Sequence, residues 1–265
     1  MTRTIPILLV MLVTSCAQSD RITAPPVSAA NAQFTETIDG TAVAFTMIPV
    51  PGDPAHGDEP FWIGRTEVTW DAYDVFVYGL DARGDDTAAD AVTQPSKPYI
   101  SMDRGFGHAG YAVLSVSDQG AMAFCAWLSR KTGRRYRLPT EAEWRFACDL
   151  GRIPPAEVGR YAWYRRNADF KTHAVGTREA DAAGLHDMYG NASEWCTGTD
   201  GLPVTLGGSY RDSMEGLGCA ARVSPSAAWN QSDPQIPRSV WWLADAGFVG
   251  FRVVCESDSQ AGEPR

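Results

Sequence analysis

Two carboxylates flank a tight turn in the second half of the chain, and their spacing suits a bound cation. Asp187 and Glu194 stand on either side of Gly190-Asn191, a pair of residue types that favours a turn. Carboxylates are hard oxygen donors, and turn carbonyls are typical further ligands of calcium. A hydrogen-bonded turn without metal is the alternative, and the residues by themselves leave the choice open.

The first of the six cysteines lies at the end of an apolar run near the N-terminus. Arg3 precedes the run 5–13, which is too short to span a bilayer but fits an export signal. The sequence Val13-Thr14-Ser15-Cys16 resembles the lipobox of bacterial lipoproteins. We therefore expect 1–16 to be a lipoprotein signal peptide and Cys16 to be lipidated and to anchor the chain. Ordinary secretion is the alternative.

Export would place the other five cysteines in an oxidising compartment. Two disulfides and one odd thiol are then expected among Cys125, Cys148, Cys196, Cys219 and Cys255.

The helix that carries Cys148 is predicted with both of its ends. Thr140 and Glu143 have the spacing of a capping box, and Pro139 disfavours helix on the N-terminal side. Gly151 suits a left-handed residue just past the last turn. One face of this helix gathers a ring, a small residue and a thiol for the core: Trp144, Ala147 and Cys148.

Regular structure elsewhere is expected in short pieces. Two helices are predicted, from the N-cap Thr69 to Val77 and from Ser117-Asp118 to near Gly133. The second has an inward stripe of Ala121, Phe124, Cys125 and Leu128. Strands are predicted at 43–50, 61–65, 206–210 and 248–254, and a long loop at 82–102.

Composition sets limits on the class of protein. The formal charge of −9 without a Lys/Arg cluster argues against nucleic acid or an anionic membrane surface as partner. The chain has 25 glycines and 17 prolines, so we expect one irregular α+β domain with little regular structure. Its predicted extent is 34–256, after a flexible tether at 17–33 and before a polar tail at 257–265.

Four sequence blocks together resemble the formylglycine-generating enzyme (sulfatase-modifying factor) family. They occur in the family's order and cover nearly all of the predicted domain. The blocks are Arg137-Leu-Pro-Thr-Glu-Ala-Glu-Trp144, Gly184-Leu185 through Gly190-Asn191 to Glu194-Trp195, Gly207-Gly208-Ser209-Tyr210, and Gly250-Phe251-Arg252.

The resemblance implies a calcium-stabilised fold related to C-type lectins. One family calcium site falls on the side chains of Asp187 and Glu194 and the carbonyls of Gly190 and Ala192. A second family site begins at Asn167, but its acidic loop is shortened between 171 and 174, so we do not expect that site.

The resemblance also implies two disulfides, Cys125 with Cys255 and Cys148 with Cys219. Cys196 is then the odd thiol. It is either a reactive thiol beside the calcium loop or, as we expect, an inert buried one.

The family's redox chemistry needs residues that this chain lacks. The generating enzymes hold copper(I) with two thiols, because copper(I) prefers soft thiolate ligands. Those thiols would lie between Tyr210 and Cys219, where this chain has no cysteine and has Asp212 at the first position. Met214 is a lone soft side chain there, and we expect it to pack. We therefore do not expect copper.

An iron site of the kind other family branches use is not expected either. The four histidines, His56, His108, His173 and His186, show no metal-binding spacing. We expect His108 and His173 to be structural or to face solvent.

Two functions from different classes remain open. The favoured hypothesis is a binding or scaffold module, held outside the cytoplasm by a lipid anchor, for a protein, peptide or glycan. Its contact surface could include Trp229, Trp241 and Trp242, although aromatic side chains in such a domain are more often core. The alternative is an oxidoreductase that acts on protein cysteine, as in sulfatase maturation, or on an unknown substrate.

Overall fold

The computed structural model describes residues 32–53, 59–81, 95–98 and 101–257. The expected signal peptide, Cys16, nearly all of the tether, most of the loop at 82–102 and most of the polar tail lie outside these residues. Within them, no helix is long and apolar enough to cross a membrane.

Three helices of two turns or more form where the sequence predicted them, and shorter helical segments follow. α1 begins after Thr69, and α2 begins after Ser117, whose Oγ accepts a hydrogen bond from the Gly120 N–H. The helical segments of the described residues are α1 (Trp70–Tyr78), α2 (Asp118–Thr132), α3 (Glu141–Leu150), η2 (Pro155–Glu157), α4 (Val158–Tyr161), η3 (Met214–Gly216) and η4 (Ala227–Asn230).

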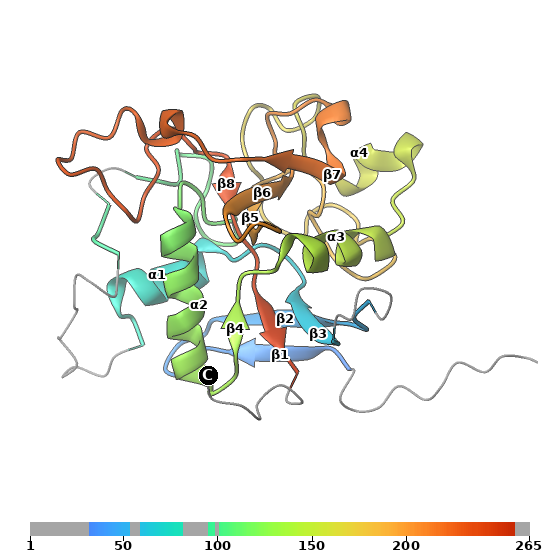
Figure 1. Cartoon of the computed structure of the whole chain (residues 1–265), viewed down its shortest axis with the longest axis horizontal. Coiled ribbons are helices and arrows are strands. Elements are labelled where there is room, and N and C mark those ends of the chain that lie inside the picture. The colour runs from blue at the N-terminus through green and yellow to red at the C-terminus, as the bar shows by residue number, and fades with distance from the viewer. Residues whose placement is uncertain (1–31, 54–58, 82–94, 99–100, 258–265) are drawn as a thin grey trace, which may run out of the picture.

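One sheet has five strands in the order β1-β2-β3-β9-β4, all antiparallel. It occupies the lower half of Figure 1, with α2 beside β4. The last strand of the chain pairs with β3 and β4, so the sheet joins both ends of the domain. Its strands are β1 (Phe34–Thr37), β2 (Ala44–Val50), β3 (Phe61–Gly64), β4 (Tyr136–Arg137) and β9 (Val254–Glu256).

The second sheet has four strands in the order β7-β6-β5-β8 and lies in the upper half of Figure 1. β5 pairs with β6 antiparallel and with the short β8 parallel. Its strands are β5 (Ser193–Thr197), β6 (Pro203–Gly207), β7 (Gly218–Val223) and β8 (Val249–Gly250).

Aromatic side chains fill the main core, which lies where α1 and α2 pack against the segment between β8 and β9. Phe124 on α2 lies 5.6 Å from Tyr73 on α1 and 5.5 Å from Phe251, measured between ring centroids. All three side chains are fully buried. Burying each ring stabilises the fold by roughly 1.5–3 kcal/mol, so a domain with little regular structure still has a large apolar core.

Two predicted strands differ from the observed ones. The strand predicted at 206–210 ends at Gly207, because Gly207 and Gly208 have left-handed φ angles of 86° and 74°. The strand predicted at 248–254 is divided into β8 and β9, which belong to different sheets. A continuous apolar run cannot show where the chain leaves one sheet for the other.

The α3 helix confirms the predicted capping box and the predicted end, but not the expected conformation of Gly151. Thr140 Oγ1 accepts from the Glu143 N–H at 3.1 Å, and Glu143 Oε2 accepts from the Thr140 N–H at 2.9 Å. Gly151 is right-handed, with φ of −67°. A Cβ at this position would lie 2.2 Å from Asp181 Oδ2, so Gly151 is required for space and not for a left-handed backbone.

Candidate functional site

A buried ion pair lies between the two sheets. Glu194 on β5 and Arg252, just before β9, are 1% and 0% exposed. Arg252 Nε donates to Glu194 Oε2 at 2.5 Å, and Arg252 Nη2 donates to Glu194 Oε1 at 2.6 Å. Trp144 on α3 donates from Nε1 to Glu194 Oε2 at 2.7 Å. The pair therefore ties α3 and β5 to the end of the chain.

Two more carboxylates are buried beside this pair. Glu67 Oε1 accepts from Asn191 Nδ2 at 2.9 Å, and Asp187 Oδ2 accepts from the Gly176 N–H at 2.7 Å. Glu67 Oε2 and Asp187 Oδ1 are buried without a hydrogen-bond partner. Burial, with the charges of Asp187 and Glu194, raises the pKa of Glu67 well above its ordinary value. Burial also raises the pKa of Asp187 to about 6.

The contacts of these carboxylates can be compared with the calcium ligands that the resemblance implies. Three buried carboxylates face one guanidinium, and the orphaned Asp187 Oδ1 is an oxygen for which a hard cation is a suitable partner. Glu194 differs from the expectation, because Arg252 and Trp144 occupy three of the roughly four acceptor positions of its carboxylate. One position, on Oε1, remains. Asp187 Oδ1 and one acceptor position of Glu194 are therefore the side-chain oxygens that could contribute to a cation site here.

Side chains alone do not make a metal site. Throughout the described ranges, no group of three His, Cys, Asp or Glu side chains is arranged to hold a metal ion. A cation at Asp187 would thus depend on backbone carbonyls.

Asn167 uses its amide to brace the local turn. Its Oδ1 accepts from the Tyr164 N–H at 2.8 Å, and its Nδ2 donates to the Ala162 carbonyl at 3.0 Å. The side chain at the start of the second family calcium site therefore has a structural role here.

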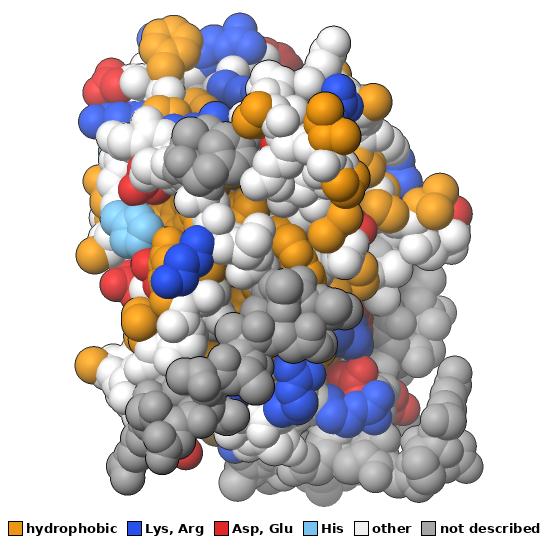
Figure 2. All heavy atoms as spheres, turned by 90° about the vertical axis from the view of Figure 1, so that its left-hand side faces the viewer, with side chains coloured by type: hydrophobic (Ala, Val, Ile, Leu, Met, Phe, Trp, Pro, Cys, Tyr) orange, Lys and Arg blue, Asp and Glu red, His pale blue; other side chains and the backbone are white. Residues whose placement is uncertain are grey.

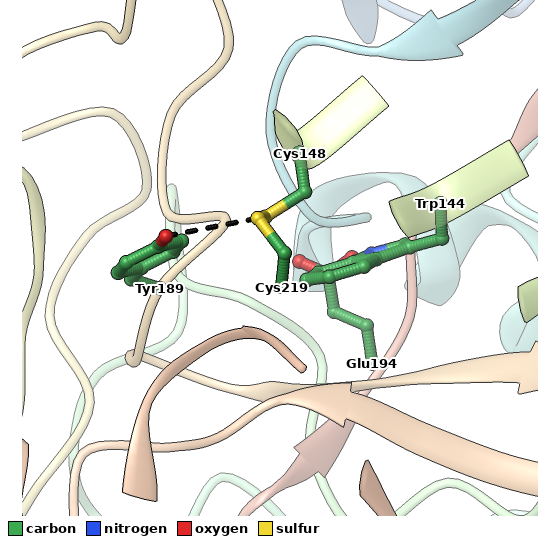
Figure 3. The surroundings of a disulfide bond; sticks show 5 residues. All are labelled: Trp144, Cys148, Tyr189, Glu194 and Cys219. Carbon is green, nitrogen blue, oxygen red and sulfur yellow. Dashed lines mark hydrogen bonds between the residues drawn. A yellow bond between two sulfur atoms is a disulfide. The ribbon is translucent and has the colours of Figure 1, made fainter. Parts of the chain in front are cut away.

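The Cys148–Cys219 disulfide, which the resemblance implied, joins α3 to β7. Its S–S distance is 2.08 Å and its Cα atoms are 5.6 Å apart. Figure 3 shows Tyr189 pointing toward the bridge, with its hydroxyl 3.6 Å from Cys219 Sγ, and Trp144 and Glu194 on the other side. Cys219 is held in this bond and is not available as a thiol ligand.

The remaining cysteines of the described chain are buried. Cys196 is 1% exposed, and burial raises its pKa well above the ordinary value, so it has the character of an inert thiol. Cys125 and Cys255 belong to one core cluster but are not bonded to each other. That bridge is not seen here, and the pairing stays a prediction.

A groove of about 360 Å³ is lined in part by Asp212, the residue to which the resemblance assigns the position of the first copper thiol. β5, β6 and β7 form one side of it, and the segments after β6 and before β8 form the other. The side chains and loops that line it include Ser193, Thr205, Arg211, Asp212, Trp229 and Phe248.

The groove has an aromatic wall with a cation resting on it. Trp229 and Phe248 meet edge to face at 5.3 Å between centroids, and the Arg211 guanidinium carbon lies 3.2 Å from the Phe248 ring centroid. Asp212 stands at the position where the resemblance implies the first thiol. Its Oδ2 accepts from the Ser209 N–H at 2.8 Å and from Ser209 Oγ at 2.7 Å, so this carboxylate stabilises the turn after β6.

Two histidines have structural contacts, as the sequence predicted. His108 lies between Asp74 and Asp103, with distances of 2.7 Å from Nε2 and 3.1 Å from Nδ1. His173 stacks on Trp163 at 3.7 Å between centroids. His186 Nδ1 lies 2.9 Å from the Arg178 carbonyl, and His56 lies outside the described residues.

The three tryptophans named as possible contact surface have different roles. Trp241 and Trp242 are 7% and 2% exposed and belong to the main core. Trp229 is partly buried and lines the groove.

Two side chains of these sites were missed from the sequence. Glu67 follows β3 in Thr66-Glu67-Val68, and nothing in that pattern shows that its carboxylate is buried. Arg211 directly follows the Gly207–Tyr210 block, a position that could have drawn attention to it.

Comparison with known proteins agrees with this fold. A family profile described as "Sulfatase-modifying factor enzyme 1-like domain" matches residues 28–257. Variable protein 1 of Treponema denticola superposes with a TM-score of 0.60 and 23% identity, covering 84% of this chain and 99% of that one. PvdO from Pseudomonas aeruginosa gives a TM-score of 0.59 and 20% identity, covering 85% and 98%.

Curated relatives match over shorter stretches. The formylglycine-generating enzyme of Mycobacterium tuberculosis is 30% identical over 155 residues, which is 50% of this chain and 45% of that protein. The chaperone protein LppX of Paenibacillus barcinonensis is 33% identical over 108 residues, covering 31% and 38%. The chain thus spans less than half the length of these relatives. The match at 28–257 covers most of the sequence and both sheets, and on this basis the chain belongs to the sulfatase-modifying factor enzyme 1-like domain family.

Proposed function

We propose that this protein is a binding module that uses the groove beside Arg211 for a segment of another protein or a peptide, outside the cytoplasm and held by lipid on Cys16. The observation that carries the proposal is the groove itself. It includes Asp212, to which the resemblance assigns the position of the first copper thiol, and it presents an aromatic wall, a guanidinium and a carboxylate engaged in a turn.

The chemistry of the groove supports binding over oxidation. The segment between Tyr210 and Cys219 contains no cysteine, and Cys219 is part of a disulfide. Copper(I) prefers soft thiolates, and the groove offers nitrogen and carboxylate groups in their place. The relative named as a chaperone gives this class of function a precedent within the similar proteins.

A structural cation belongs to the same proposal. Calcium held by Asp187, Gly190, Ala192 and Glu194 would offset the excess negative charge at the ion pair and give Asp187 Oδ1 a partner. When bound, it supplies charge compensation and rigidity beneath the groove strand β5.

Groove binding is tested with the same substitution at two neighbouring alanines of β7, whose side chains lie on opposite faces of the strand. Ala221 lines the groove, and Ala220 is its exposed neighbour on the strand, with a side chain on the opposite face. The purified protein is applied to an array of random twelve-residue peptides. We expect sequence-selective binding that Ala221→Trp abolishes and Ala220→Trp retains. Selective binding unaffected by Ala221→Trp, or no selective binding at all, would contradict the proposal.

The oxidoreductase alternative is tested separately. The protein is incubated with copper(I) or iron(II), its metal content is measured, and oxygen consumption is followed with a cysteine-containing sulfatase peptide. We expect no turnover above that of free metal. Stoichiometric metal with peptide oxidation would establish the alternative.

A further inference from the structure

We propose that Arg211 is the anchor of the groove and that it binds a carboxylate group of the ligand, such as an acidic side chain or the C-terminus of a peptide. This inference rests on the proposed use of the groove and names the chemical class that the groove selects.

Arg211 is positioned for such a contact. Its guanidinium carbon lies over the Phe248 ring, 3.2 Å from the ring centroid. Phe248 in turn is fixed by Trp229 at 5.3 Å between ring centroids. The ring contact restrains the plane of the guanidinium and leaves its N–H edge for an acceptor. A fork of donors held in this way matches the two oxygens of a carboxylate.

The donors of Arg211 are uncommitted. No described residue accepts a hydrogen bond from its side chain or forms an ion pair with it, and its backbone carbonyl alone is used, by Arg165 Nε at 2.9 Å. Partial burial lowers the pKa of Arg211 from its ordinary value, although Asp212 opposes the shift. Arg211 is nevertheless exposed, and its guanidinium donors have no acceptor among the described residues, so they are accessible to an anionic ligand.

Arg222 also borders the groove, but its side chain is on the face of β7 opposite to Ala221 and is engaged there. Arg222 Nε donates to both oxygens of Glu141 at 3.2 Å, and Arg222 Nη1 donates to Ser224 Oγ at 3.2 Å. The two guanidinium groups therefore differ in role, and Arg211 is the one available to a ligand.

The surroundings favour a single negative charge. Arg165 and Arg166 are exposed, and Arg165 Nε contacts the Arg211 carbonyl at 2.9 Å, in a protein whose formal net charge is −9. Figure 2 shows several Lys and Arg side chains, with Asp and Glu among them, at the upper end of the molecule, the end where Figure 1 places β7. Asp212 lines the same groove, and its charge opposes a dianion more strongly than a monoanion. A carboxylate therefore fits better than a phosphate.

The probe is 3-phenylpropionate, which combines one carboxylate with a ring that can contact Trp229. The neutral comparison is 3-phenylpropionamide, which has nearly the same shape. Binding is followed by nuclear magnetic resonance of the arginine Nε–Hε groups in the full folded chain. The Arg211 signal is assigned by its loss in Arg211→Lys, and its position reflects shielding by the Phe248 ring.

We expect saturable binding of the carboxylate that shifts the Arg211 signal, and binding of the amide at least about tenfold weaker. Arg211→Lys keeps the charge but loses the planar fork and should weaken carboxylate binding by about tenfold. Arg166→Lys makes the same exchange on an exposed neighbour outside the groove and should leave the affinity unchanged. Thermal melting of each variant establishes that it is folded.

Several outcomes would overturn the assignment. These are equal binding of acid and amide, no saturation by the acid at millimolar concentration, equal effects of the two arginine exchanges, and tighter binding of inorganic phosphate than of the acid. If the carboxylate result fails while Ala221→Trp still abolishes peptide binding, the groove remains the site and Arg211 is not its anchor. If both fail, the proposed function fails.

Discussion

At the scale of single residues, the buried pair of Glu194 and Arg252 determines what its neighbours do. The guanidinium donates to both oxygens of Glu194 and to the carbonyls of Gly64 and His186, at 2.9 and 3.0 Å. The sequence showed Glu194 and Arg252 only as members of two separate blocks. Their pairing could not be predicted from the residues, because it depends on β5 and the end of the chain meeting at one point.

The first prediction concerns this pair. Arg252→Met leaves the Glu194 carboxylate buried without a counter-charge and should reduce the free energy of unfolding by about 3–5 kcal/mol. Arg222→Met removes a more exposed partner of Glu141 and should cost less than about 1 kcal/mol. Urea denaturation of both variants measures the difference. Similar losses of unfolding free energy in the two variants would contradict the prediction that the buried pair contributes more to stability.

The second prediction concerns the proposed cation. Calcium at a hundredfold excess over its dissociation constant should stabilise the protein by about 2.7 kcal/mol, seen as a higher melting temperature than in chelator. Asp187→Asn should abolish this difference. Asn167→Ala should retain it, because that side chain braces a turn.

Glu194→Gln is a less direct test of the same site. It weakens the ion pair with Arg252 as well as any cation contact, so its lower stability has two causes. Identical melting of the unmodified protein in calcium and in chelator would contradict the proposal.

At the scale of elements, prediction succeeded where the signals were local. The α3 capping box and the ends of α2 follow from residues that are neighbours in sequence, and both are confirmed. The end of α3 at Gly151 was predicted correctly, but the left-handed conformation expected for Gly151 was wrong, because glycine is needed there to accommodate Asp181 from a distant loop. The strand at 248–254 was wrong for a similar reason, since its two halves pair with different sheets.

The third prediction concerns the link between α3 and β7. Replacing Cys148 and Cys219 together by alanine opens a loop with a sequence separation of 71 residues and should destabilise the domain by about 2–5 kcal/mol. Cys196→Ala removes a buried thiol without a crosslink and should cost less. Denaturation of the oxidised proteins gives the comparison, and non-reducing peptide mapping checks the pairing. A bridge that includes Cys196 would contradict the assignment.

The fourth prediction concerns His108, which lies between Asp74 on α1 and Asp103. Burial would lower the pKa of His108, but its hydrogen bonds to Asp74 and Asp103 and their charges raise it overall. A histidine with a raised folded-state pKa adds stability that is complete below its unfolded pKa of about 6.5. That stability is lost as pH rises through the folded-state pKa.

The melting temperature should therefore fall more between about pH 6 and pH 9 in the unmodified protein than in His108→Gln. Asp118→Asn, a change at the start of another helix, should keep the unmodified dependence. A pH dependence that survives in His108→Gln would assign the effect to another group.

At the scale of the whole molecule, the fifth prediction concerns the proposed anchor. Cys16→Ala should move the protein from the membrane fraction to the soluble fraction without changing the melting temperature of the domain, because the residues that form the two sheets begin at Phe34. Membrane fractionation with a melting curve of the soluble form measures both. If Cys16→Ala stays in the membrane fraction, the proposal that lipid on Cys16 anchors the protein is wrong.

The position of β9 has a consequence for how the molecule is made. β9 lies inside the five-stranded sheet, between β3 and β4, and β8 is joined to β5 in the other sheet. Synthesis and any passage through a membrane pore that starts at the N-terminus deliver these two strands last. Neither sheet is complete until that part of the chain has emerged, so β3, β4 and β5 keep an unpaired edge until then. A chain shortened by its last ten domain residues would lack both closing strands, and its unfinished sheets would expose edges that promote aggregation.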